Sequence, residues 1–140
     1  MTWPAPDFEH LLLSSRAMQQ MEEALFAEGL PVAALMEQAG LGLAQAVLRH
    51  PDLKRHGLLV LVGPGHNGGD GLVVARELHL RGIAVRIWSP FNAHKPLTAE
   101  HLRYAQWLGI PQLETAPDPS DPALWLDALF GLGQQRRLGP

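Results

Sequence analysis

The sequence predicts an α/β protein: a doubly wound, Rossmann-like parallel sheet with two leading helices, in three α/β/α layers. Three observations lead to this prediction. After residue 57, short apolar runs alternate with segments of helical periodicity, which is the order that parallel βαβ units require. A glycine-rich stretch with the spacing G-x-G-x-x-G follows the first apolar run. A second Gly-x-Gly loop follows the last apolar run.

Two helices are expected before this alternation begins. Residues 14–28 form the first, which Ser14 or Ser15 can cap and Gly29 can end. Residues 32–49 form the second, whose small residues suit a place where another backbone packs closely. At helical spacing, the inward stripe of the first helix contains Ala17, Met21, Ala24 and Leu25, and that of the second contains Leu35, Met36, Ala39, Leu43, Ala46 and Val47.

The remaining elements follow in order along the chain. The continuous apolar run between Gly57 and Gly63 is typical of a strand that is covered on both faces. A helix from about Gly71 to Arg81 follows the glycines, with Asp70 at its N-cap. Residues 83–88, 110–114 and 123–131 are the later strands, and residues 98–108 are a helix between them.

Composition excludes several classes of function. A chain of 140 residues fits one domain, residues 1–140, and its net charge of −3 argues against a nucleic-acid or anionic-membrane surface. There are no cysteines, which excludes disulfides, thiolate zinc sites and cysteine nucleophiles. No apolar run is long enough to span a membrane, and residues 1–10 lack a signal-peptide pattern, so we expect a cytoplasmic protein.

The glycine-rich stretch predicts an anion site, because a helix N-terminus after a strand presents backbone N–H groups and a favourable dipole. A conventional NAD-dependent dehydrogenase is disfavoured, since there is no Asp or Glu between Glu77 and Glu100 to bind the ribose. No Lys follows the glycines, so a P-loop is excluded too. The seven histidines have no zinc-ligand spacing.

In the common strand order 3-2-1-4, the first and fourth strands are neighbours, so both glycine-rich loops would line one crevice. Four side chains there have two interpretations each. Asn67 is a turn residue or a hard oxygen ligand for a cation, and Asp70 is a helix cap or a contact for a polar ligand. Asp127 accepts backbone N–H bonds or helps to hold an ion. His66 faces solvent or touches a substrate, and Trp125 and Phe130 are expected in the core rather than as stacking platforms.

Three separated motifs resemble the NAD(P)H-hydrate epimerase family, also called the YjeF N-terminal domain. The first is the loop GPGHNGGDGLVVAREL from Gly63 to Leu78, in which His66 stands where the family commonly has Asn. The second is LMEQAG, Leu35 to Gly40, and the third is DALFGLG, Asp127 to Gly133. The family domain continues with further βα units beyond residue 140, so the resemblance implies that its C-terminal part is missing here.

The resemblance implies an isomerase that interconverts the R and S epimers of hydrated NADH and NADPH (NADHX and NADPHX) in cofactor repair. It also implies a potassium ion held by Asn67 and Asp127, a homodimer, and functional coupling to an NAD(P)H-hydrate dehydratase. The catalytic residue is not identified, because the family's further aspartate lies beyond Pro140. The substrate-binding residues carried over from the family are His66, Asn67, Gly68, Gly69, Asp70, Gly131, Leu132, Gly133, Gln134, Gln135, Arg136 and Arg137.

A function of a different class stays open beside the epimerase. The same crevice would serve a non-catalytic module that binds a nucleotide or a protein partner. Arg136 and Arg137 could pair with phosphates in either case.

Overall fold

The computed structural model describes residues 12–139, which divide after Pro31 into two compact units. Residues 1–10, on which the expectation about a signal peptide rests, lie outside the described residues. In the first unit, helix α1 (Ser15–Ala27) begins after Ser14, whose hydroxyl accepts a hydrogen bond from the Ala17 amide at 3.1 Å. The expected inward stripe is wrong for this unit taken by itself: α1 buries no residue, and Met21 and Leu25 are 49% and 45% exposed.

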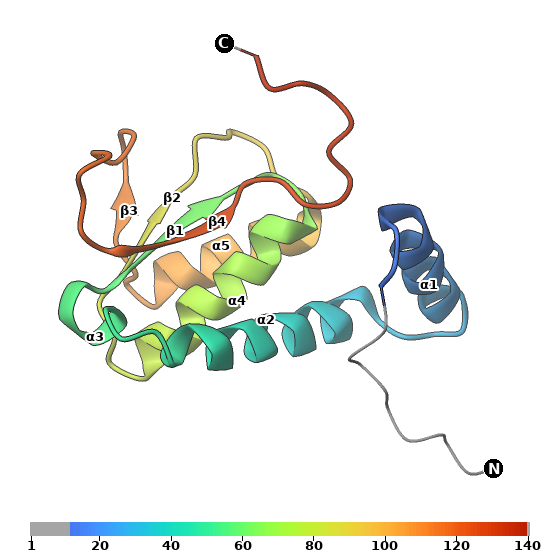
Figure 1. The fold of residues 1–140 in the computed structure, drawn as a ribbon, viewed down its shortest axis with the longest axis horizontal. Coiled ribbons are helices and arrows are strands. Elements are labelled where there is room, and N and C mark those ends of the chain that lie inside the picture. Colours follow the sequence, from blue (N-terminus) through green and yellow to red (C-terminus); the bar gives the residue numbers. More distant parts are fainter. Residues whose placement is uncertain (1–11, 140) are drawn as a thin grey trace. The chain divides into compact units, whose positions relative to one another are not determined.

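The second unit contains a parallel sheet of four strands in the order β3-β2-β1-β4 (Figure 1). Strand β1 is Leu58–Val62 and β2 is Val85–Trp88. Strand β3 is Gln112–Leu113 and β4 is Leu124–Ala128. All five residues of β1 are buried, as expected for a continuous apolar run at the centre of a parallel sheet. The α/β class and the strand order 3-2-1-4 are therefore confirmed.

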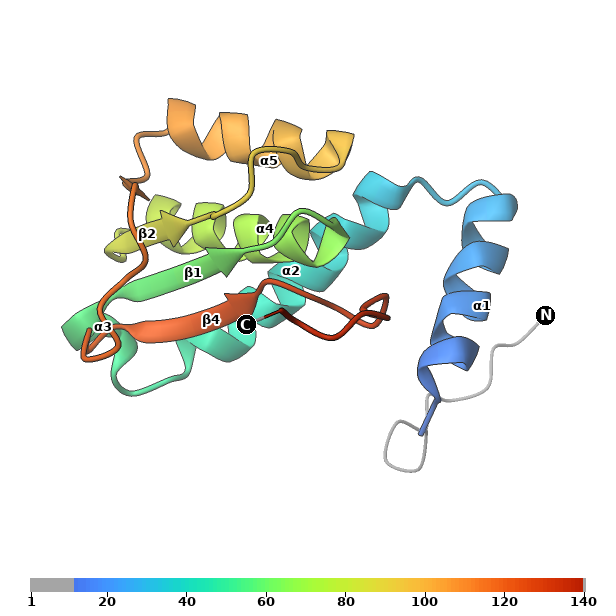
Figure 2. The ribbon, with the colours of Figure 1, turned by 90° about the horizontal axis from the view of Figure 1, so that it is seen from above.

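Helices cover one face of this sheet (Figures 1 and 2). They are α2 (Val32–Leu48), α4 (His66–Leu80) and α5 (Pro96–Trp107), with the short α3 (Leu53–His56) before β1. The main core lies between these helices and the sheet. It includes Leu58, Val60 and Val62 of β1 with Ala44, Leu72, Leu78 and Ala105 of the helices.

Within the second unit, residues 32–139, no helix covers the opposite face, so this part of the chain has two of the three expected layers. Leu59 and Leu61 form a small apolar cluster there with Ala123, against which Trp88, Leu113 and Leu129 pack. The steps from β1 to β2 and from β2 to β3 run in one direction, and right-handed crossovers place both of their helices on one face. Residues 114–123, which lead from β3 to β4, contain no helix.

The face through which helix α2 contacts the core matches the expected one only in part, since Met36 is buried and Val47 packs against the core as expected. Met36, Gly40 and Ala44 are buried, whereas Ala39, Leu43 and Ala46 are exposed. The reason is the close crossing with α4, because a Cβ added at Gly40 would lie only 2.4 Å from Val73 Cβ. The buried stripe therefore consists of residues that are four positions apart and is centred on Gly40. Among the described residues no helix is long and apolar enough to cross a membrane.

Candidate functional site

The two glycine-rich loops lie side by side at the carboxyl edge of the sheet, as predicted. The Gly63 amide, just after β1, donates to the carbonyl of Ala128, the last residue of β4, at 2.9 Å. The approach is so close that a Cβ at Gly63 would lie 1.7 Å from the Leu129 carbonyl oxygen. Adjacent parallel strands end at one edge, and glycine lets the two chains meet there without a side chain between them.

Helix α4 begins at His66, five residues earlier than expected, with Gly65 at its N-cap. Asp70 therefore lies inside the helix, and the prediction that it caps the N-terminus is wrong. Glycine is a poor helix former, so the stretch was expected to be loop. Here its glycines serve close packing instead: a Cβ at Gly69 would lie 2.5 Å from Met36 Sδ, and one at Gly71 would lie 2.6 Å from Ala128 Cβ.

The predicted substrate residues from His66 to Asp70 consequently form the start of α4. His66 is exposed, and Asn67 and Asp70 are half-buried. A Cβ at Gly131, in the second loop, would lie 3.2 Å from Asn67 Cβ and 3.7 Å from its Oδ1. The start of α4 and the second loop are thus in contact, and Asn67 is the side chain between them.

Asp127 lies on the exposed face of β4, in register with Leu61 of β1. Its Oδ1 accepts a hydrogen bond from the Leu129 amide at 3.0 Å, so the interpretation as a backbone acceptor is confirmed. The remainder of the predicted substrate loop, residues 131–137, is exposed. Within the described part of the chain, no group of three or more His, Cys, Asp or Glu residues could hold a metal ion.

The segment between β2 and the first turns of α5 also contacts the first loop, which the sequence reasoning missed. The Ser89 hydroxyl donates to the Val62 carbonyl at 3.1 Å, and the Lys95 amide donates to the Pro64 carbonyl at 2.8 Å. Single polar residues in a connection have no periodic pattern, so nothing in the sequence distinguished them. The third such contact, from Thr98 Oγ1 to the Gly65 carbonyl at 2.8 Å, comes from a residue that was expected to begin a helix.

An ion pair joins α2 to α4 behind the first loop. Arg76 donates to both carboxylate oxygens of Glu37, and these two residues belong to separate sequence motifs. His101 of α5 lies near this pair, and its pKa is lowered, mainly by burial and then by the positive charge of Arg76. Two carboxylate–guanidinium bonds fix the geometry of a helix pair better than one contact would, so the pair holds α2 across α4.

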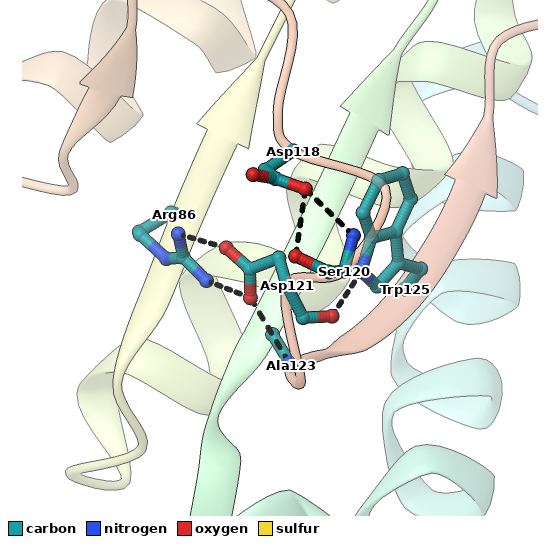
Figure 3. Close-up of polar contacts among 6 residues, drawn as sticks. All are labelled: Arg86, Asp118, Ser120, Asp121, Ala123 and Trp125. Carbon is teal, nitrogen blue, oxygen red and sulfur yellow. Dashed lines mark hydrogen bonds and ion pairs between the residues drawn. The ribbon is translucent and has the colours of Figure 1, made fainter.

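A second ion pair stabilises the connection 114–123 on the helix-free face (Figure 3). Arg86 of β2 donates two hydrogen bonds to Asp121, at 2.6 and 2.8 Å, and the Ala123 amide donates a third at 3.0 Å. The Arg86 hydrogen bonds, followed by the one from the Ala123 amide, lower the pKa of the Asp121 carboxyl to about 2.

Beside this ion pair lies a cavity of about 560 Å³. It is on the helix-free face and is lined by Trp88, Ala116, Pro117, Pro119, Asp121 and Trp125. The expectation that Trp125 and Phe130 belong to the core is wrong, since they are 36% and 39% exposed. Trp125 is on the sheet face that no helix of residues 32–139 covers, and Phe130 makes an edge-to-face contact with Phe91 at 6.0 Å between ring centres.

Comparison with known proteins finds similar sequences and a similar structure. The chain is 46% identical over 128 residues to a bifunctional NAD(P)H-hydrate repair enzyme, Nnr, of Thermosynechococcus vestitus, covering 91% of this chain and 25% of the relative. It is 38% identical over 137 residues to an NAD(P)H-hydrate epimerase of Rhodobacter capsulatus, covering 91% of this chain and 65% of the relative. The crystal structure of the yeast protein ynu0 superposes with a TM-score of 0.75 at 27% identity, covering 92% of this chain and 60% of that one.

The chain thus spans about a quarter of the length of the bifunctional relatives. The family described as "YjeF-related protein N-terminus" matches residues 32–140, which include both glycine-rich loops and all four strands. On this match, and on the shared fold of the yeast protein, the chain belongs to the YjeF-related protein N-terminus family.

Proposed function

We propose that this chain binds NADHX and NADPHX and interconverts their R and S epimers. The observation that carries the proposal is the junction of the two family loops, in which Gly63 meets Leu129 and Asn67 meets Gly131. The relatives named NAD(P)H-hydrate epimerase support the choice of reaction. The substrate would lie across this junction, with contacts from His66 to Asp70 and from Gly131 to Arg137.

Anion binding is the first task of such a site, because the substrates carry a pyrophosphate. The start of α4 offers backbone N–H groups and the positive end of the helix dipole. In the second loop, Arg136 and Arg137 are exposed and can pair with phosphate oxygens. The glycines of the two loops have no side chains, so a ligand can approach the backbone closely.

A potassium ion is the cofactor we propose, held by the side-chain oxygens of Asn67 and Asp127. Hard oxygens suit a hard cation, and Asn67 and Asp127 belong to the two loops that meet at this edge. The ion would supply positive charge beside Asp127 and so favour a phosphate-bearing ligand. Asp127 keeps one carboxylate oxygen besides the one that accepts from Leu129.

Epimerisation must break and remake a bond at the hydrated carbon of the nicotinamide ring. Reversible ring opening, or loss and return of the hydroxyl with electrons pushed by the ring nitrogen, would serve. Either route uses an acid/base group, and the carboxylates that the two family motifs place at this edge are Asp70 and Asp127. The two glycine-rich loops would position the substrate for this step.

We further propose that the protein works in the cytoplasm, as a homodimer, and alongside an NAD(P)H-hydrate dehydratase that uses the S epimer. Three relatives are named bifunctional NAD(P)H-hydrate repair enzymes, which supports such coupling.

The direct test supplies the R epimer of NADHX together with a dehydratase specific for the S epimer, and follows recovery of NADH at 340 nm absorbance. We expect recovery faster than spontaneous epimerisation, and a rate that depends on this protein's concentration. If the rate equals the spontaneous one while the protein still binds NADHX, the chain is a non-catalytic binding module and the epimerase proposal fails.

The potassium proposal needs a separate experiment, in which rate and binding are compared in KCl and in choline chloride. Asp127→Asn keeps the shape and a side-chain oxygen but removes the charge. We expect the potassium needed for half-maximal activity to rise roughly tenfold or more in this variant, as for loss of a charged ligand. If the rate is the same in both salts, the potassium proposal fails.

A further inference from the structure

We propose that Thr98 of α5 is a positioning residue for this site, acting with Ser89 and the Lys95 amide to set the direction of the peptide groups in the first glycine loop. The inference deepens the proposed function and rests on it for the identity of the ligand. The positioning itself is a property of the loop, which can be measured separately.

Three hydrogen bonds reach the first loop from one segment, residues 89–98. Each ends on a different carbonyl: Ser89 Oγ binds that of Val62, the Lys95 amide that of Pro64, and Thr98 Oγ1 that of Gly65. Their lengths are 3.1, 2.8 and 2.8 Å. A loop of small residues has many conformations available, and three contacts within four residues select one of them.

The direction of these bonds has a consequence for the opposite side of the loop. In a planar trans peptide, the C=O and the following N–H point in opposite directions. The unit between Val62 and Gly63 shows this, since its carbonyl accepts from Ser89 while its N–H donates to Ala128. The Pro64 and Gly65 carbonyls face the segment 89–98, so the N–H groups of Gly65 and His66 point away from it.

The burial of Thr98 indicates that its hydroxyl has a specific use. It is fully inaccessible to solvent and is the only buried polar side chain within residues 12–139. A hydroxyl is costly to bury unless it forms a hydrogen bond, and valine has almost the same shape without that cost. Thr98 packs closely against Gly69, since a Cβ added at Gly69 would lie 3.1 Å from Thr98 Oγ1. If this position needed only such packing, valine would serve.

Ser89 contributes in the same way and not as a nucleophile. Its hydroxyl has one hydrogen, which is donated to the Val62 carbonyl. The Ser89 oxygen must therefore accept the 2.8 Å hydrogen bond from His94 Nε2, which places a proton on that nitrogen. A histidine that acts as a base toward serine would need the opposite arrangement, so this pair orients the loop.

The test compares Thr98→Val, which removes the hydroxyl and keeps the shape, with Thr98→Ser, which retains the hydroxyl. Amide hydrogen exchange is measured at Gly63 and Gly68, because these amides donate within the loop region to Ala128 and Gly65. The KM and kcat for the R epimer of NADHX and the Kd for NADP+ are measured on the same samples. Ile110→Val, a buried change away from the loop, controls for lost stability, and the exposed Thr115→Val controls for the substitution itself.

We expect Thr98→Val to speed exchange at Gly63 and Gly68 about fivefold relative to Ile110→Val, as for loss of one hydrogen bond. KM or Kd should rise by a similar factor, with kcat changed less, and Thr98→Ser should restore wild-type values. If wild-type protein neither binds NADP+ nor epimerises NADHX, the proposed function fails while the exchange data still decide the positioning role. If the loop-amide exchange rates and the KM of Thr98→Val stay within twofold of those of Ile110→Val, the positioning role of Thr98 is overturned. If Thr98→Val does not fold, Ser89→Ala is measured and judged by the same criteria.

Discussion

Asn67, at the start of α4, and Gly131, in the loop after β4, are in direct contact, although 64 residues separate them in the sequence. A Cβ added at Gly131 would lie 3.2 Å from Asn67 Cβ, so the position has room for no larger side chain unless Asn67 moves. The proposed potassium ligand and the proposed substrate loop therefore depend on each other's position.

Gly131→Val should displace Asn67 and weaken both ion and substrate binding. We expect the KM for NADHX and the potassium requirement to rise together, each roughly tenfold, because displacing a ligand group by a fraction of an ångström costs that much or more. The measurement is the coupled epimerase assay across a potassium titration. Gly139→Val is the matched control, since a Cβ there would meet nothing within 4 Å and the residue lies outside the proposed substrate loop; equal kinetics for the two variants would contradict the prediction.

Gly63→Ala should destabilise the fold much more than Gly65→Ala, whose cost is limited to the weaker N-cap preference of alanine, although both add one carbon atom in the same loop. The new Cβ at residue 63 would lie 1.7 Å from a backbone oxygen of Leu129, whereas the one at residue 65 meets nothing within 4 Å. Because the backbone of Leu129 cannot rotate away as a side chain can, we expect Gly63→Ala to lower the free energy of unfolding by about 3 kcal/mol or more. Urea denaturation measures both, and similar midpoints for the two variants would show that the strands do not approach so closely.

The sequence predicted the frame of this site well. A fully apolar run predicts β1, and the βα alternation is typical of the order 3-2-1-4, which places the two glycine-rich loops side by side. These inferences succeed because strand burial and crossover handedness leave few arrangements open. The family resemblance then assigned the residues of the loops.

The errors have a common physical origin, which is that packing between elements overrides local propensity. Gly68 and Gly69 were expected to precede α4, but they lie within the helix, where its neighbours approach too closely for side chains. The hydroxyl of Thr98 and the Ser89–His94 pair could not be found, because a tertiary hydrogen bond to a loop carbonyl has no pattern along the chain. The exposure of Trp125 follows from the absence of a helix over its face within residues 32–139.

Asp121 makes acid stability depend on Arg86. The pKa of the Asp121 carboxyl is lowered from 3.8 to about 2, first by the Arg86 hydrogen bonds, so the folded state favours the ionised form. The stabilisation is therefore complete above about pH 4 and is lost as pH falls toward 2. We expect Asp121→Asn to flatten the fall in unfolding free energy between pH 4 and 2, as measured by urea denaturation at each pH. Arg86→Gln should do the same, and the double variant should add little; a fall as steep as that of the wild type would contradict the pairing.

Strand β4 pairs with β1 on one side and is the edge of the sheet on the other, among the residues described. Unpaired strand edges invite association, so we expect the 140-residue chain to dimerise or aggregate reversibly as its concentration rises. Trp125→Lys, on the exposed face of this edge strand, should weaken the association, because charge discourages edge pairing. Sedimentation velocity over a concentration series measures both chains, and a wild-type monomer throughout would contradict the prediction.

We propose that NADHX or NADPHX binds where the two glycine-rich loops meet. The most direct measurement is the change in backbone amide chemical shifts as NADPHX is added to ¹⁵N-labelled protein in potassium buffer. We expect the largest changes at residues 63–70 and 131–137, with little change around the cavity that Trp88 and Trp125 line. Changes centred on Trp88 and Trp125, with the two loops unaffected, would contradict it.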